Sequence, residues 1–196
     1  MIEVSPIKSV KKINYIKKLL SEKWKIRLLV LFSIGINSAL RISNLLSIQV
    51  KHLFKSDWTV KDSFEIQEKK TKKKHKVTFP PKTKKAIELY KKTYPSNIEN
   101  EDNYIFFRAK SNEKWQHHIS RVQGWKNIGQ RCRAVWLEGN YWGHSFRKTQ
   151  GWMARSNGVP LSVIQHKLNH SSQKVALKYI GITQEEVDEA VYNLDL

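Results

Sequence analysis

Four segments of the sequence contain side chains whose types and spacing could carry out phosphoryl transfer. Transfer to a protein nucleophile needs donors that hold the non-bridging phosphate oxygens, an acid for the leaving oxygen, and a nucleophile that is free to approach in line. Arginine, lysine, histidine and tyrosine can supply these functions without a metal ion. The segments are GINSALRISNLLSIQ at 35–49, EKKTKKKHKVTF at 68–79, HSFR at 144–147 and LNHSSQKVALKY at 168–179.

These segments resemble the motifs of the tyrosine recombinase and phage integrase family. Arg41 matches the first arginine of the family, which opens a helix and grips the scissile phosphate. His144 and Arg147 match the His-x-x-Arg box, and their spacing puts both side chains on one face of a helix. His170 matches the histidine that precedes the nucleophilic tyrosine by nine residues, and the nucleophile is then Tyr179.

The family also places a lysine on a β-hairpin between the first two motifs. Its Lys-Thr turn is similar to Lys70 followed by Thr71, and we assign Lys70 to that position. Other lysines surround this residue, and Lys73 stays open as the alternative. The motifs follow the order of the family over residues 41–179, which is about the length of its whole catalytic domain.

Four positions depart from the usual pattern of the family. Ala39 stands where glycine is usual, Lys148 where histidine is frequent, and Asn169 directly before the histidine of the third motif. Asn44 stands where an acid usually follows the first arginine and braces neighbouring structure. None of these departures removes a catalytic side chain, but Asn44 bears on how firmly Arg41 is oriented.

The resemblance implies a metal-free transesterification that needs neither ATP nor another cofactor. The tyrosine would attack phosphorus and form a 3′-phosphotyrosyl link, which leaves a free 5′-hydroxyl. The arginines would hold the phosphate oxygens, the hairpin lysine would protonate the departing 5′ oxygen, and the two histidines would relay the tyrosine proton and hydrogen-bond the phosphate. The catalytic set implied in this way is Arg41, Lys70, His144, Arg147, His170 and Tyr179.

The chain is strongly basic, with 36 Lys and Arg against 17 Asp and Glu and a formal net charge of +19. A folded protein keeps such an excess when a polyanion relieves the self-repulsion, and double-stranded DNA is the expected partner. The lysines would contact phosphates without reading sequence, although a lysine-rich hairpin is also typical of a solvated edge strand. The predicted DNA contacts are Lys69, Lys72, Lys73, Lys74, Lys76 and Lys148.

The spacing of the apolar residues predicts a mostly helical chain. From Asp57 to Phe79, alternating residues predict two strands that flank KKTKKKHK at 69–76. Pro95 to Asn103 is expected to be a loop. Helices are predicted behind a Ser9 cap at Val10–Leu20, at Trp24–Ile36, from about Arg41, around Ala86–Tyr90, and at Val122–Trp136, Ser145–Arg155, Leu161–Leu168 and Ser172–Tyr179.

The expected fold is the mixed α+β catalytic domain of the family, mostly helical with a small antiparallel β-sheet, over residues 1–182. Residues 183–196 form an amphipathic helix with five acids and no Lys or Arg, which leaves 12 acids against 36 basic residues in the body, a charge of +24. This acidic helix either closes its own core or docks on a neighbouring protomer of a homo-tetramer on two DNA sites. Nothing before Val10 could form the N-terminal core-binding domain of most relatives, so we expect a minimal recombinase or a fragment.

Other classes of function fit the sequence less well. The longest apolar run, Leu28–Ile36, falls short of the roughly 20 residues that a membrane span requires. The N-terminus lacks an apolar signal segment and the single cysteine, Cys132, cannot form an internal disulfide, so we expect a cytoplasmic protein. His166 and His170 have the spacing of metal ligands, but no glutamate or Cys cluster completes a site, and we expect no metal.

Two rivals remain open beside the leading reading of a site-specific DNA recombinase or integrase. A type IB topoisomerase would use the same chemistry, but the short chain and the acidic tail favour a recombinase. A DNA-binding regulator that no longer cuts would belong to the same family. The presence of all six catalytic side chains argues against it.

Overall fold

The computed structural model describes residues 4–23, 25–69, 71–108, 115–137, 139–141, 144–180, 188 and 192–193. These residues are mostly helical and contain one sheet of two antiparallel strands, which confirms the expected fold class. The elements are α1 (Val10–Glu22), α2 (Ile26–Ser38), α3 (Ile42–Leu46), α4 (Val50–Leu53), β1 (Ser63–Gln67), β2 (Lys74–Thr78), α5 (Pro81–Thr93), α6 (Pro95–Ile98), α7 (Arg121–Arg133), α8 (Ser145–Ser156), α9 (Leu161–Lys167) and α10 (Gln173–Ile180).

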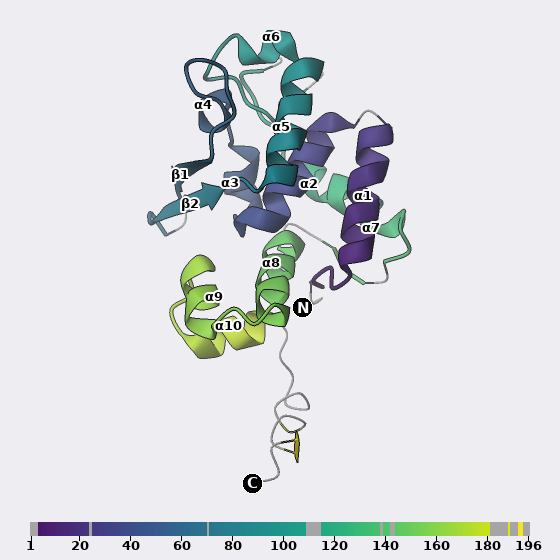
Figure 1. The fold of residues 1–196 in the computed structure, drawn as a ribbon, viewed down its shortest axis with the longest axis vertical. Helices are drawn as coiled ribbons and strands as arrows, with labels where there is room; N and C mark the ends of the chain where they lie inside the picture. The colour runs from purple at the N-terminus through teal and green to yellow at the C-terminus, as the bar shows by residue number, and fades with distance from the viewer. Residues whose placement is uncertain are drawn as a thin grey trace.

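Helix α2 lies at the centre of the fold. Ten of its thirteen residues are buried, because its sequence is apolar on all sides and α1, α5 and α8 pack around it. Gly35 allows the closest of these contacts, since a Cβ at this position would overlap the ring of Phe146 from α8. In Figure 1, α1, α2 and α5 form the upper part of the molecule, and α8, α9 and α10 form the lower part.

The hairpin of β1 and β2 is held in a fixed register. Ser63 pairs with Thr78 and Gln67 with Lys74, and the residues between them alternate between buried and exposed faces. The prediction that the strands flank the whole run 69–76 is wrong at its end: β2 begins at Lys74, since His75 and Val77 point inward and alternate with exposed residues. The connection is therefore the short turn 68–73, closed by a hydrogen bond of 2.9 Å from the Glu68 amide to the Lys73 carbonyl.

The structure agrees with most of the predicted helices and corrects two regions. Ser9 caps α1, its hydroxyl accepting from the Lys12 amide at 3.2 Å. The prediction of a loop from Pro95 to Asn103 is wrong over its first four residues, which form α6; proline is well suited to the first position of a helix because it has no N–H to satisfy. The four-residue helix α4 was not predicted, because a single turn is too short to show a repeating spacing of apolar residues.

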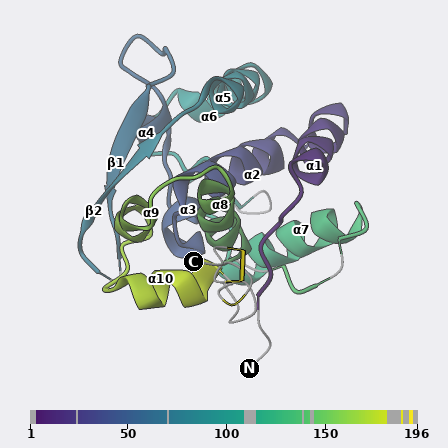
Figure 2. The same cartoon turned by 60° about the horizontal axis from the view of Figure 1, so that its bottom comes forward.

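The apolar residues form one large cluster and one small one. The large cluster holds α1, α2, α5, α7 and the inner face of the hairpin together. The small cluster consists of Ala39, Ile164, Leu168 and Ile180, and it joins the end of α2 to α9 and α10. Figure 2 shows α9 between α8 and the hairpin, and the Lys167 ammonium donates to the Lys76 carbonyl on β2 at 2.8 Å.

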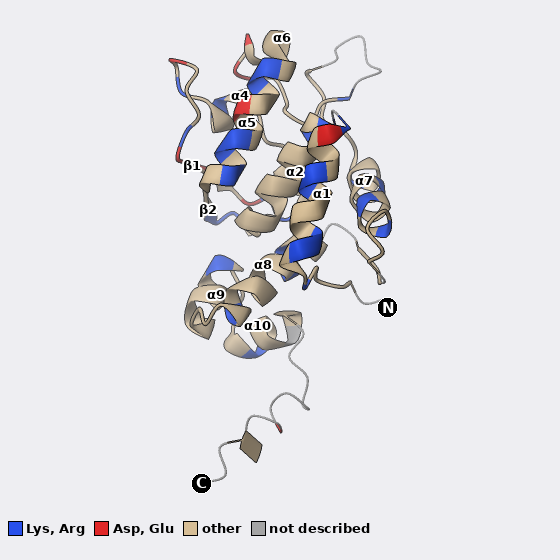
Figure 3. Cartoon of the chain, turned by 45° about the vertical axis from the view of Figure 1, so that its right-hand side comes forward, with Lys and Arg blue, Asp and Glu red and all other residues tan. Residues whose placement is uncertain are grey.

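The predicted acidic helix at 183–196 lies outside the described residues except for Asp188, Tyr192 and Asn193. None of the described helices is long and apolar enough to cross a membrane. Figure 3 shows Lys and Arg along α1, α5 and α7, with fewer acidic residues between them.

Candidate active site

The first arginine lies where α2 ends and α3 begins. Ala39 ends α2 with φ 59°, in the left-handed region that favours glycine, the residue usual at this position in the motif. The chain then extends through Arg41, which is the N-terminal cap of α3. The Arg41 side chain is 21% exposed, and its Nη1 donates to Oε2 of Glu68. One end of this ion pair is therefore open to a ligand from solvent.

The second arginine is almost fully buried on α8. Arg147 is 1% exposed, and its Nη1 donates to the Ala39 carbonyl at 2.6 Å. Its Nη2 donates to the Leu168 carbonyl. These two carbonyls cap α2 and α9, so the guanidinium joins the ends of two helices that are far apart in the sequence.

One buried carboxylate connects the two arginines. Glu68 has no exposed surface, and its Oε2 accepts from Arg41, from Thr71 Oγ1 at 2.7 Å and from Asn169 Nδ2 at 3.3 Å. Its Oε1 lies 3.8 Å from Arg147 Nη1. Burial alone would raise the pKa of Glu68, but the Thr71 hydrogen bond and the two arginine charges together hold this pKa below its ordinary value. The carboxylate is therefore ionised at neutral pH.

The tyrosine of the third motif lies on α10 beside both histidines. Its hydroxyl oxygen is 3.2 Å from Nδ1 of His144. The rings of Tyr179 and His170 meet edge-on, with 4.8 Å between centroids. Burial raises the pKa of Tyr179 to about 12, although Arg147 and Arg41 act to lower it. The phenol is therefore protonated at neutral pH, and His144 is placed to accept its proton.

His170 lies beside the same tyrosine ring and has a strongly lowered pKa. Burial, followed by the charges of Arg147 and Arg41, lowers the pKa of His170 to about 4. The ring is therefore neutral at physiological pH and can donate one hydrogen bond. Its Nδ1 is buried and has no hydrogen-bond partner among the described residues.

Two depressions of the structure lie away from these side chains. A depression of about 570 Å³ is lined by α4 and the loop after it, and another of about 510 Å³ lies between α2 and α7. No described catalytic candidate lines either of them. Within the described part of the chain, no group of three or more His, Cys, Asp or Glu side chains is placed to hold a metal ion.

Comparison with known proteins identifies the family. The model of the phage integrase family matches residues 8–186. The Bacillus subtilis (strain 168) protein "Probable integrase/recombinase YoeC" is 36% identical over 191 residues, covering 97% of this chain and 96% of YoeC. The chain belongs to the phage integrase family. This confirms the resemblance that the four motifs indicate.

Solved structures of recombinases share the fold of this integrase-family chain. The crystal structure of XerA recombinase matches with a TM-score of 0.73 at 16% identity, covering 98% of this chain and 65% of XerA. XerH site-specific recombinase, in a post-cleavage complex bound to palindromic difH substrate, also matches with 0.73 and 16%, covering 98% of this chain and 53% of XerH. The chain thus spans between about half and two thirds of these two proteins.

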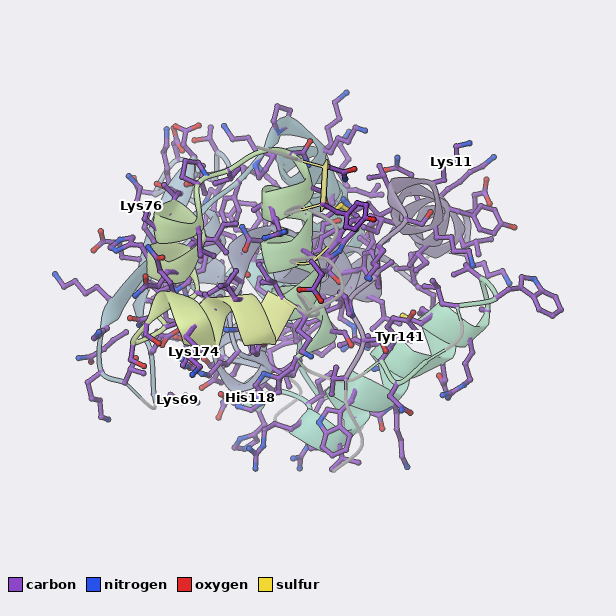
Figure 4. The ribbon with its side chains drawn as sticks, turned by 90° about the horizontal axis from the view of Figure 1, so that it is seen from below. Lys11, Lys69, Lys76, His118, Tyr141 and Lys174 are labelled. Carbon is purple, nitrogen blue, oxygen red and sulfur yellow. The ribbon has the colours of Figure 1, made fainter. Side chains whose placement is uncertain are left out.

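The predicted lysines of this integrase-family chain fall into three groups. Lys70 lies outside the described residues, and its alternative Lys73 is exposed between β1 and β2. Lys148 is 9% exposed, and its Nζ is 5.7 Å from the centroid of the Tyr179 ring, so it lies within the site rather than on the hairpin. The remaining predicted contacts are exposed hairpin residues: Lys69, Lys72, Lys74 and Lys76. Figure 4 labels Lys69 and Lys76.

Five of the six predicted catalytic residues are described, and the structure brings all five together. The charges of Arg41 and Arg147 act on the Tyr179 hydroxyl. The rings of both histidines contact the tyrosine ring. Sequence reasoning missed Glu68 as a functional residue. The available signal was that Glu68 is the one acid in the basic segment 68–79.

Proposed function

We propose that this chain is a site-specific DNA recombinase or integrase that cleaves and rejoins DNA through a 3′-phosphotyrosyl intermediate. The observation that carries the proposal is the position of the Tyr179 hydroxyl, 3.2 Å from the His144 ring nitrogen in a site that also contains Arg41 and Arg147. A nucleophile beside a base and two guanidinium groups is the arrangement that transfer of a phosphodiester to tyrosine requires.

The two arginines have different parts in the proposed reaction. Each guanidinium is a planar fork that can hold phosphate oxygens through two parallel N–H bonds. Arg41 is partly exposed and meets the phosphate from the side of the hairpin. Arg147 is fixed by two backbone carbonyls, so its charge is already in place when the pentacoordinate state develops.

Proton transfer completes the proposed mechanism. His144 accepts the phenol proton as Tyr179 attacks phosphorus, and the neutral His170 donates a hydrogen bond to a phosphate oxygen. Lys70, with Lys73 as its alternative, protonates the 5′ oxygen that leaves. The phosphotyrosyl link conserves the energy of the broken bond, so the 5′-hydroxyl can attack it in turn without ATP or a metal ion.

Double-stranded DNA is the proposed partner, and a homo-tetramer on two DNA sites is the proposed active form. The net charge of +19 and the exposed hairpin lysines support binding to a polyanion. The relative XerH is described as bound to a difH substrate, and a lambda integrase tetramer as bound to a Holliday junction. In the proposed tetramer the acidic segment 183–196 docks on a neighbouring protomer, which would couple cleavage to assembly.

Covalent capture tests the proposed function. The protein is incubated in EDTA with a library of nicked duplexes from the DNA that flanks its gene, denatured, and assayed for protein-linked DNA. We expect an adduct with the wild type and none with Tyr179→Phe, which removes only the nucleophilic oxygen. Tight DNA binding without any adduct would refute the proposal in favour of a DNA-binding regulator, and plasmid relaxation without strand exchange would favour a topoisomerase.

A thiol leaving group distinguishes the two candidate lysines. A duplex with a 5′-bridging sulfur at the scissile position needs no general acid, because a thiolate leaves without a proton. We expect Lys70→Ala to cleave the ordinary duplex slowly and the sulfur-containing duplex at about the wild-type rate. The same pattern for Lys73→Ala, with Lys70→Ala unaffected, would assign the acid to Lys73 instead.

A further inference from the structure

A single carboxylate contacts all four segments that carry the proposed catalytic residues. Glu68 belongs to the hairpin turn, and through its Oε2 it accepts from Arg41 before α3 and from Asn169 directly before His170. Its Oε1 faces Arg147 on α8 at 3.8 Å. The side chain is completely buried, whereas Glu65 on the adjacent strand β1 is exposed.

Glu68 also shapes the turn that contains Lys70. Its side chain accepts from the Thr71 hydroxyl at 2.7 Å, and its backbone carbonyl accepts from the Lys72 amide at 2.8 Å. The Glu68 amide in turn donates to the Lys73 carbonyl at 2.9 Å. The residue that pairs with the arginines therefore also fixes the backbone on both sides of the predicted general acid.

The charges of the site explain why a carboxylate is needed there. Two guanidinium groups close to one another repel: burial lowers the pKa of Arg147, and the charge of Arg41 lowers it further. Before a phosphate binds, an anion must offset this repulsion, because an unpaired buried charge is strongly unfavourable. His75 also faces Glu68, with Nδ1 3.6 Å from Oε1, but burial lowers the pKa of this histidine and leaves it neutral.

The residue at position 44 explains why the negative charge opposite the arginines comes from the hairpin turn. The usual acid of the first motif is absent at this position, and the amide that replaces it is 1% exposed. Its Oδ1 accepts from the Lys69 amide at 3.3 Å, and its Nδ2 has no hydrogen-bond partner within the described structure. The Asn44 side chain thus lies against the turn that starts at Glu68, but it carries no charge with which to hold Arg41.

We propose that Glu68 is the positioning residue of this site, which holds Arg41 and Arg147 in the arrangement that receives the scissile phosphate. It takes the place of the acid that the family has at position 44. The proposal rests on the proposed function, since the phosphate is the substrate that both guanidinium groups would share. Glu68 itself does not touch the phosphate; it acts through the two arginines and through the turn.

The test compares Glu68→Gln with Glu65→Gln, which makes the same change of charge at an exposed position of the same hairpin. The substrate is the nicked duplex that the wild type cleaves fastest in the capture experiment, prepared with either a phosphate or a methylphosphonate at the scissile position. A methylphosphonate lacks the negative charge that the arginines neutralise. Single-turnover adduct formation and the Kd for DNA are measured for each protein, and circular dichroism verifies folding.

We expect Glu68→Gln to slow cleavage of the phosphate duplex by about tenfold to a hundredfold, because a misplacement near 1 Å costs a rate of that order, while the Kd changes little. Glu65→Gln should cleave like the wild type. On the methylphosphonate duplex the gap between Glu68→Gln and the wild type should shrink to about threefold or less, since there is less charge to stabilise.

Two results would overturn the positioning role: wild-type cleavage by Glu68→Gln, or equal slowing on both duplexes, which would indicate a loss of folding alone. If Glu68→Gln is unfolded, Thr71→Val replaces it in the same comparison, because it keeps the charge of Glu68 and removes one hydrogen bond to the carboxylate and a long one of 3.4 Å from Asn169. Failure of the proposed function is recognised separately, since the wild type would then form no adduct at all.

Discussion

Replacement of Gly151 by alanine should displace Tyr179, the proposed nucleophile, while leaving the fold in place. Gly151 is on α8, and a Cβ there would lie 2.6 Å from Cγ2 of Ile180 and 3.2 Å from Cδ1 of Leu168. Carbon atoms in contact are normally about 3.5 to 4.0 Å apart, so the shortfall against Ile180 is about 1 Å. Cγ2 is attached directly to Cβ in a side chain with one preferred helical rotamer, so α10 must move as a whole.

The displacement of α10 should change the cleavage rate more than the free energy of unfolding. Alanine gains about 1 kcal/mol over glycine in a helix interior, while overpacking costs about 1 to 3 kcal/mol, so the net loss is about 2 kcal/mol at most. Tyr179 is the neighbour of Ile180 and moves with it relative to His144 on the other helix. A displacement near 1 Å from the attacking geometry should slow cleavage by about a hundredfold.

The assay is single-turnover formation of the covalent adduct, with DNA binding and thermal unfolding measured in parallel. Gly124→Ala is the matched control, because it makes the same change inside α7 against Cδ1 of Leu46 at 3.3 Å, the mobile end of a side chain. The reasoning is refuted if folded Gly151→Ala cleaves within about threefold of the wild type, or if Gly124→Ala is impaired equally.

Three further predictions concern protons and charge. In His144→Ala the cleavage rate should rise about tenfold per pH unit between pH 7 and 9, because burial raises the pKa of Tyr179 to about 12 and water must remove the proton; a flat profile would contradict this. Burial and the two arginines lower the pKa of His170 to about 4, so the unfolded chain binds more protons than the folded chain between pH 4 and 6.5. The free energy of unfolding thus decreases as the pH is lowered through that window. The free energy of unfolding should therefore drop from pH 7 to 5 by about 2 kcal/mol more in the wild type than in His170→Asn, and urea unfolding giving parallel curves would exclude the shift. If Lys72 and Lys73 each contact a phosphate, replacing both with alanine should reduce the slope of log Kobs against log salt by about 2, whereas an unchanged slope would mean that they remain in solvent.

The sequence predicts the parts of the site that are set by local spacing. His144 and Arg147 are one helical turn apart, and His170 and Tyr179 are joined by a short helix, so their relation follows from the period of the helix. The amphipathic helices are predicted for the same reason. Their exact ends are less predictable, because caps such as Ala39 depend on what packs against them.

The parts that were not predicted depend on packing between distant segments. Glu68 is separated by 27 residues from Arg41 and by 101 residues from Asn169, and nothing local reveals that these side chains meet. The position of Lys148 is a similar case. Its charge suggested a solvent-exposed contact with DNA, but α8 buries it beside the tyrosine ring because neighbouring elements cover that face.

The small cluster of Ala39, Ile164, Leu168 and Ile180 lies outside the large core, where the end of α2 meets the described helices α9 and α10. The large core does not depend on it, so α9 and α10 can open locally at a free energy below that of global unfolding. The proposed nucleophile, Tyr179, therefore lies in a part of the fold that has a smaller buried cluster than the main core. If Tyr179 is the nucleophile, as proposed, local opening of α10 would move it away from His144 while the large core stays folded.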